Sequence, residues 1–250
     1  MYYSVKFDVL SILDDSVIAT YNTYEDWFLV PTSRPVLEMP SIKTNYVDIP
    51  GASGQLDLTY ILTKYPLYEN RSGSLDFAVL NEHDGYRWID ILNMIARGIN
   101  GKKVRAYLED DPDYYYEGHW RLSNWKSNNN RTWSDVTIEY DVDPYKYYKT
   151  DKVFTKSGSE SSKQFVFSTN DVGSMPVVPS ITVSNTDGAG ITLALTNNEL
   201  GIIDLSKKIE SNGTHKFYDL ILSMVNSSNT CTLSVFGSGQ VTISFRKGDL

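Results

Sequence analysis

The sequence predicts a mainly β protein with two domains, an α+β first domain that contains one helix and a β-sandwich that follows it. Three observations support this prediction. Most apolar residues recur with the two-residue period of half-buried strands, one segment has a helical period, and the composition changes near residue 150. The 250 residues suffice for two domains. Their cores need no disulfides, and the single cysteine, Cys231, can form none within the chain.

Strands are expected over much of the first domain, residues 1–150. Apolar and polar residues alternate in VRAYLE (104–109), YEGHWRLSNW (116–125) and SDVTIEYDV (134–142), whereas VKFDVL (5–10) is compatible with a strand or a helix. Turn-forming residues, such as the three asparagines at 128–130, separate these runs. The first domain is therefore expected to hold β-sheets.

One convincing helix interrupts these strands, in YRWIDILNMIARGIN at residues 86–100. Trp88, Ile91, Leu92 and Ile95 fall at positions i, i+3, i+4 and i+7, which lie on one face of a helix with 3.6 residues per turn. These four side chains are expected to form the face that packs on the core.

A glycine-rich loop, PGASG at residues 50–54, lies between two strand-like stretches. It lacks the Lys-Ser/Thr of a P-loop and the three-glycine spacing of a dinucleotide site, and no helical pattern follows it. Pro50-Gly51 is a turn dipeptide, and Gly54 permits a positive φ angle. The loop is therefore predicted to be a structural turn rather than a phosphate site.

The composition changes where the second domain begins. All five tryptophans precede residue 134, and Tyr218 is the only one of the 18 tyrosines after residue 149. The Ser/Gly-rich stretch KSGSESSKQ (156–164) reads as a linker, so the joint is placed at 151–163. Residues 164–250 carry strand-like runs with turns between them, which predicts a β-sandwich. These runs lie at 165–168, 178–184, 190–196, 200–205, 217–224, 230–236 and 239–246.

The sequence argues against several classes of function. A net charge of −8 and the lack of a basic run disfavour nucleic acids and anionic membranes as partners. No apolar stretch reaches the roughly 18 residues of a membrane-spanning helix, so membrane insertion is not expected. The histidines lie far apart, and no calcium-loop pattern appears among the acidic residues. No catalytic residue, metal ligand or cofactor is therefore predicted.

Tyrosines are unusually dense in two places of the first domain. Consecutive and alternate tyrosines occupy both faces of any strand, so one set must meet solvent, another subunit or a sugar. Because tyrosine combines apolar area with a polar tip, it is enriched at interfaces. The sequence therefore predicts an oligomer interface that includes Tyr114, Tyr115, Tyr116, Tyr145, Tyr147 and Tyr148.

Three segments together resemble a known family. IPGASGQLDLT (49–59) is similar to the Pro-Gly-x-x-Gly-x-Leu-Asp signature of the distal tail proteins of siphophages that infect Gram-positive bacteria. YDVDPYKY (140–147) is similar to the Asp-Pro-Tyr that closes the first domain of that family. VTISFRKGDL (241–250) resembles the basic Gly-x-Leu C-terminus common there, and the three anchors keep the order and spacing of the family.

The resemblance implies a fold and a structural role. It implies a first domain that assembles into a homo-hexameric ring at the tail tip, with a galectin-like β-sandwich on the outside. It implies as partners the tail tube protein, the tail-associated hub or lysin protein, and receptor-binding or baseplate proteins. The location would be the distal tip of the virion tail, assembled in the host cytoplasm.

Two other functions stay open at this point. A carbohydrate-binding adhesion module would need a groove in residues 164–250 lined by exposed aromatic rings, but the few rings there stand mostly within strands. A glycan-degrading enzyme would need two carboxylates about 5–10 Å apart in a cleft. The non-enzymatic ring protein is the favoured hypothesis.

Overall fold

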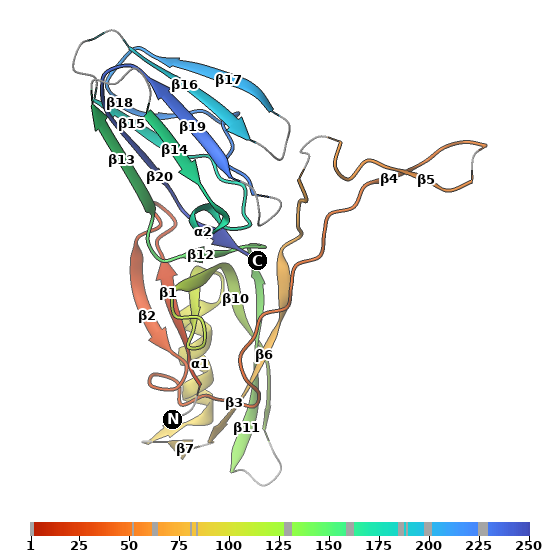
Figure 1. Cartoon of the computed structure of the whole chain (residues 1–250). Coiled ribbons are helices and arrows are strands. Elements are labelled where there is room, and N and C mark those ends of the chain that lie inside the picture. Colours follow the sequence, from red (N-terminus) through yellow and green to blue (C-terminus); the bar gives the residue numbers. More distant parts are fainter. Residues whose placement is uncertain are drawn as a thin grey trace. The chain divides into compact units, whose positions relative to one another are not determined.

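The structure is a computed structural model, and it confirms the mainly β fold (Figure 1). It describes residues 3–250 apart from 52, 62–64, 81, 84, 128–131, 159–162, 185–187, 189, 198–201 and 225–229. The chain divides into two compact units, Met1–Lys146 and Tyr147–Leu250. Among the described residues, neither helix is long and apolar enough to cross a lipid bilayer.

The first unit is built on an antiparallel sheet with the strand order β2-β1-β9-β10-β11-β6-β3. The longest ladder runs between β11 and β6, from Trp133 opposite Leu80 to Val142 opposite Arg71. The strands are β1 (Val5–Leu10), β2 (Val17–Asn22), β3 (Val30–Pro31), β6 (Arg71–Leu80), β9 (Lys103–Leu108), β10 (Tyr114–Ser127) and β11 (Trp133–Val142).

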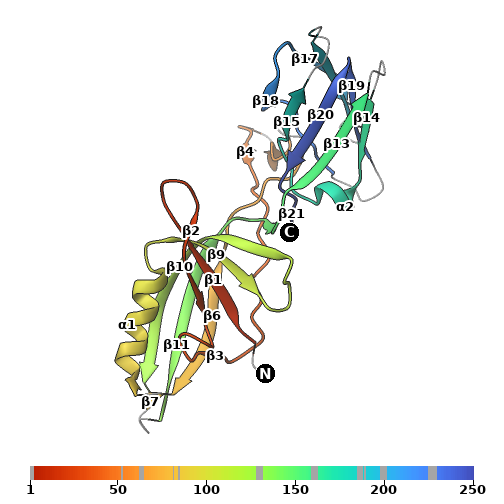
Figure 2. The ribbon, with the colours of Figure 1, turned by 90° about the vertical axis from the view of Figure 1, so that its left-hand side faces the viewer.

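One face of this sheet packs on helix α1 (Trp88–Ile99), which Figure 2 shows alongside the strands. The helix buries Ile91, Leu92 and Ile95, and Trp88 packs half-buried against the same cluster. The sheet contributes apolar side chains from alternate positions of each strand, such as Phe7, Trp120 and Ile138. A short hairpin, β7 (Glu82–His83) with β8 (Tyr86–Arg87), leads into the helix.

The second unit is a β-sandwich of two four-stranded antiparallel sheets. Apolar side chains from both sheets form one continuous core. One sheet has the order β13-β20-β15-β18, with β13 (Lys152–Gly158), β20 (Gly239–Phe245), β15 (Ser180–Ser184) and β18 (Gly213–Lys216). The other has the order β14-β19-β16-β17, with β14 (Lys163–Phe167), β19 (Cys231–Phe236), β16 (Ile191–Asn197) and β17 (Ile202–Ile209). The second unit also contains the short helix α2 (Thr169–Val172) and strand β21 (Gly248–Asp249), which pairs with β12 (Lys146–Tyr148).

The prediction of a linker at 151–163 is wrong for residues 152–158, which form strand β13. This strand pairs with β20 over its whole length, from Lys152 opposite Phe245 to Gly158 opposite Gly239. Most of its exposed side chains are polar, as suits an edge strand, although Val153 is exposed as well. Its inward Phe154 lies 5.1 Å from the Phe167 ring. Residues 159–162 lie outside the described part of the chain.

One strand of the predicted sandwich is also misplaced. The apolar pattern of residues 217–224 predicts a strand, but in the structure an isolated bridge joins Leu222 to Val177, and the strand lies just before this segment, at β18. Leu220 and Leu222 are nevertheless buried in the core. Their apolar pattern therefore reflects burial of an irregular segment.

Removing β13 is expected to destabilise the second unit by about 2–3 kcal/mol. Phe154 is only partly buried, so its loss costs less than the ~3–5 kcal/mol of a fully buried phenylalanine. Urea unfolding of fragment 147–250 should show one cooperative transition, and fragment 163–250, which keeps β14, should unfold at lower urea. Equal midpoints for the two fragments would mean that β13 contributes nothing to the sandwich.

Candidate assembly surface

A two-stranded hairpin of the first unit joins no other sheet. Strand β4 (Tyr46–Asp48) pairs with β5 (Gln55–Asp57) in antiparallel register (Figure 1). The structure places Pro50, Gly51 and Gly54 in the turn between the strands, as the glycine pattern predicts. Gly51 and Gly54 have φ angles of +80° and +89°, which residues with a Cβ rarely adopt. The loop is thus a turn in the structure.

The hairpin belongs to a longer excursion of the chain, residues 41–69, which we call the arm. At its base the chain runs antiparallel to itself. The Lys43 amide donates to the Leu67 carbonyl at 2.8 Å, and the Glu69 amide donates to the Ser41 carbonyl at 2.8 Å. Every described residue from 41 to 57 is exposed. Over that stretch, the described residues of the first unit leave the arm largely uncovered.

The two faces of the hairpin differ in chemistry. Val47 lies opposite Leu56 on one face, and the two side chains are 45% and 49% exposed. Asp48 lies opposite Gln55 on the other face, where the Gln55 amide donates to the Asp48 carboxylate at 2.9 Å. Other large apolar side chains of the arm are exposed as well, namely Ile42, Tyr46, Ile49, Tyr60, Ile61 and Leu67.

An isolated two-stranded hairpin is marginally stable in water, and contiguous exposed apolar surface marks interaction sites. The hairpin has one apolar face, as do strand pairs that pack on a hydrophobic core. Among the described residues, no such core packs against this face. Its geometry therefore fits a segment that packs on another molecule.

Two further apolar surfaces lie at opposite edges of the main sheet. At the β2 edge, Ile12 and Leu13 are almost fully exposed in the turn that precedes the strand. At the β3 edge, a pocket of about 570 Å³ is lined by apolar side chains that include Phe28, Leu80 and Trp133. The first unit thus offers several apolar surfaces, although its net charge is acidic.

The predicted tyrosine interface is only partly available. Tyr115 and Tyr116 are only 4% and 8% exposed. They pack inside the subunit and are therefore not part of an exposed interface. Arg105 lies 5.0 Å from the Tyr115 ring and Arg71 lies 5.4 Å from the Tyr116 ring. The remaining members are half-buried, namely Tyr114, Tyr145, Tyr147 and Tyr148. The sequence showed the density of tyrosines but not which strand face each one occupies.

Burial also changes the acidity of two tyrosines. Burial and the neighbouring Tyr68 and Tyr65 raise the pKa of Tyr145 to about 12. Burial and the Asp8 carboxylate raise the pKa of Tyr107 to about 12. Both hydroxyls therefore keep their protons in the folded protein at pH values where exposed tyrosines ionise.

The fold is expected to lose stability as the pH rises from 10 to 12. Because the folded state holds these protons more tightly than the unfolded state, their contribution is complete below pH 10 and vanishes above the folded pKa. Urea unfolding across this range should show the decline, and Tyr145→Phe should make it shallower. A Tyr145→Phe profile parallel to the wild-type profile would contradict the raised pKa of Tyr145.

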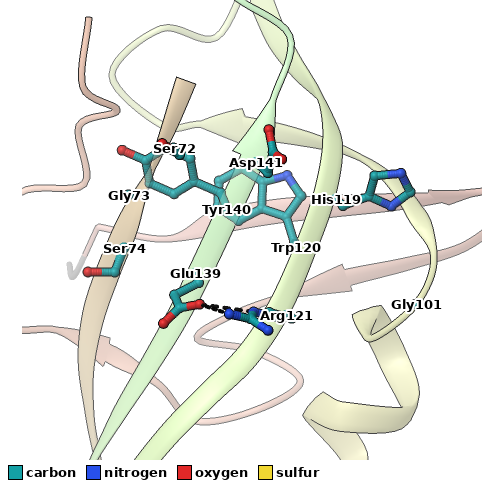
Figure 3. A pocket seen from close by; sticks show the side chains of 10 residues that line it. All are labelled: Ser72, Gly73, Ser74, Gly101, His119, Trp120, Arg121, Glu139, Tyr140 and Asp141. Atoms are coloured by element: carbon teal, nitrogen blue, oxygen red, sulfur yellow. Dashed lines mark hydrogen bonds and ion pairs between the residues drawn. The ribbon is translucent and has the colours of Figure 1, made fainter. Parts of the chain in front are cut away.

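A polar pocket of about 720 Å³ lies on the main sheet, between β6, β10 and β11 (Figure 3). Arg121 and Glu139 point toward one another from adjacent strands, and the Arg121 Nε donates to Glu139 at 2.9 Å. This hydrogen bond lowers the pKa of Glu139, with Ser123 adding to the effect. A general acid for glycan cleavage needs a raised pKa, so Glu139 has the opposite character.

Two further polar side chains of this pocket, His119 and Asp141, are also engaged. The His119 ring nitrogen Nδ1 lies 3.1 Å from the Lys102 carbonyl oxygen, and Asn70 donates to the Asp141 carboxylate at 2.9 Å. Across the described residues, no group of three or more acidic, histidine or cysteine side chains is placed to hold a metal ion. The pocket has the chemistry of an ion-paired sheet face.

The fold defines a class of protein in which a sheet backed by one helix is followed by a β-sandwich. A solved structure has this arrangement, the crystal structure of the SPP1 Dit protein (gp 19.1), described as a paradigm of the hub adsorption apparatus in phages that infect Gram-positive bacteria. The similarity covers 98% of this chain and 99% of that chain, with a TM-score of 0.60 and 13% sequence identity. The chain therefore shares the fold of the SPP1 Dit protein. No protein-family model and no curated protein sequence matches it.

Proposed function

We propose that this protein is a structural distal tail protein of a siphophage, which forms a closed homo-hexameric ring at the tail tip. Residues 1–150 would build the ring. The sandwich, which would have a galectin-like topology, would lie outside it. The ring would join the tail tube protein to the tail-associated hub and to receptor-binding or baseplate proteins. The fold that this chain shares with the SPP1 Dit protein over 98% of its length supports this role.

The observation that carries the proposal is the exposed arm. A head-to-tail ring needs two different surfaces on each subunit that fit one another around a closed rotation. An amphipathic hairpin whose apolar face is about half exposed among the described residues of the first unit supplies one such surface. The apolar surfaces at the sheet edges offer candidates for the other.

The charge of the chain bears on the conditions of assembly. Each subunit carries a net charge of −8, so copies repel one another at long range. Salt screens this repulsion over a Debye length of about 8 Å at physiological ionic strength, whereas apolar contacts persist. The ring should therefore form more readily as the salt concentration rises.

Electron microscopy with size measurement tests the proposal. The protein is examined alone and mixed with the tail-tube and hub proteins of the same phage, at low and at high salt. Six-fold rings with contacts from residues 1–150 are expected in the mixture. Complexes that hold one copy of this protein and one copy of the hub protein, or rings joined only by residues 164–250, would overturn the proposal. Binding of cell-wall glycans by such non-assembling particles would instead support a carbohydrate-binding adhesion module.

A further inference from the structure

The segment that leads into the arm is held firmly where it leaves the sheet. Leu37 is buried in the core, whereas its neighbours Val36 and Met39 are exposed. The adjacent Glu38 is anchored through both of its backbone groups, as described next. We call residues 36–39 the root of the arm. The chain thus passes from the buried Leu37 to the exposed residues of the arm within a few positions.

Arg71, the first residue of β6, contacts the root through its guanidinium. Its Nη1 donates to the Glu38 carbonyl at 3.1 Å and lies 3.7 Å from the Met39 sulfur, and its Nε donates to the Pro144 carbonyl at 2.8 Å. The guanidinium also lies 5.4 Å from the Tyr116 ring. One side chain therefore ties the root to the turn that follows β11.

This arginine is buried without a counter-charge. It is 2% exposed, and within the described chain it forms no ion pair with a carboxylate. Its Nη2 is buried and has no hydrogen-bond partner among the described residues. Burying a charge in this way costs stability, and well-packed apolar residues often stabilise a fold better than buried charged groups do. Core stability alone therefore does not explain why an arginine stands here.

Tyr140 completes the hold on the root from the neighbouring strand. Its hydroxyl oxygen accepts the Glu38 amide proton at 3.0 Å. The ring can reach this position because it lies across Gly73, its partner in the β6–β11 ladder (Figure 3). A Cβ atom at Gly73 would lie 2.5 Å from the tyrosine hydroxyl oxygen. The glycine is thus required by the placement of this ring.

We infer that Arg71 is a positioning residue, which together with Tyr140 clamps the root and fixes the direction in which the arm leaves the sheet. The planar guanidinium binds carbonyls from two separate segments at once with donors held in a rigid fork. Methionine has no donor, and the donors of a lysine ammonium lack this fixed geometry. The role in assembly rests on the proposed ring, whereas the clamp itself is a property of the single subunit.

The first test is amide hydrogen exchange on the full-length monomer. In Arg71→Met, the amides of Glu38, Lys43 and Glu69 are expected to exchange at least tenfold faster, while core amides of α1 keep their relative protection. Tyr140→Phe should accelerate the Glu38 amide by about fivefold, the value of one lost hydrogen bond. Unchanged exchange at these amides in Arg71→Met would overturn the inference.

A matched control separates positioning from general destabilisation. Ile138→Ala removes a buried side chain from the same strand as Tyr140 without touching the clamp. It should lower the unfolding midpoint at least as much as Arg71→Met but leave the arm amides at wild-type rates. Equal acceleration in both variants would show that the clamp has no specific role.

The second test measures ring formation by electron microscopy, with tail-tube and hub proteins present, well below the melting temperature. Arg71→Met is expected to reduce the fraction of subunits in rings at least tenfold, and Ile138→Ala is expected to assemble normally. If Arg71→Met shows faster amide exchange in the arm but still assembles normally, the positioning role is overturned. Failure of the wild type to form rings would overturn the proposed function and leave the exchange result standing.

Discussion

Replacing Ile91 with aspartate is expected to unfold the first unit, or to destabilise it by about 4–5 kcal/mol. Ile91 is fully buried on the face of α1 that packs against the sheet. The substitution removes a well-packed side chain and leaves a carboxylate without a partner in an apolar core, two of the most costly changes a fold can suffer. Far-ultraviolet circular dichroism and urea unfolding measure the loss.

Asn93→Asp is the matched control, because it adds the same charge to the same helix. Asn93 is exposed on the opposite face, so its replacement should change the stability of the unit by less than about 0.5 kcal/mol. Losses of similar size in the two variants would mean that the orientation of α1 is wrong.

The helix and the main strands could be predicted because their periods follow directly from burial. A helix that packs on one face of a sheet needs apolar residues every three or four positions, and residues 88–95 have them. The central strands alternate strictly because one face contacts that helix and the other meets solvent. In these segments, local pattern and tertiary environment agree.

Strand β13 could not be predicted because it lies at an edge. Its segment, KVFTKSG, has few apolar residues, since an edge strand meets the core with fewer side chains than a central one. The Ser/Gly content that suggested a linker instead suits an exposed edge. Only the pairing with β20, a partner about 90 residues away in the chain, reveals the strand.

Neither the clamp nor the full character of the arm could be predicted. Arg71 and Pro144 are far apart in sequence, and their contact depends on the β6–β11 ladder. The residues around PGASG predict a turn between two strands, and in the structure strands β4 and β5 pair there. The period of two in these strands also implies that another surface covers their apolar face. In the structure this cover is missing from the described chain, which directs attention to another molecule.

Replacing both Val47 and Leu56 with serine is therefore expected to abolish ring assembly while leaving the fold intact. Both side chains are about half exposed in the subunit, so the loss of stability should stay below about 1 kcal/mol. If the neighbouring subunit buries the exposed half of each, the pair contributes about 2 kcal/mol to every contact, or roughly 30-fold in affinity. A closed ring repeats this contact at each interface, so the effect on assembly is larger than on a single contact.

The control uses the adjacent cross-strand pair on the opposite face of the same hairpin. Asp48→Ser with Gln55→Ser breaks one exposed hydrogen bond and introduces the same two residues, but it leaves the apolar face unchanged. Electron microscopy and sedimentation of each variant, with tail-tube and hub proteins present, should show rings for the control and single subunits for the apolar variant. If both variants assemble like the wild type, the arm makes no energetically important contact, and the ring must be joined through the apolar surfaces at the sheet edges.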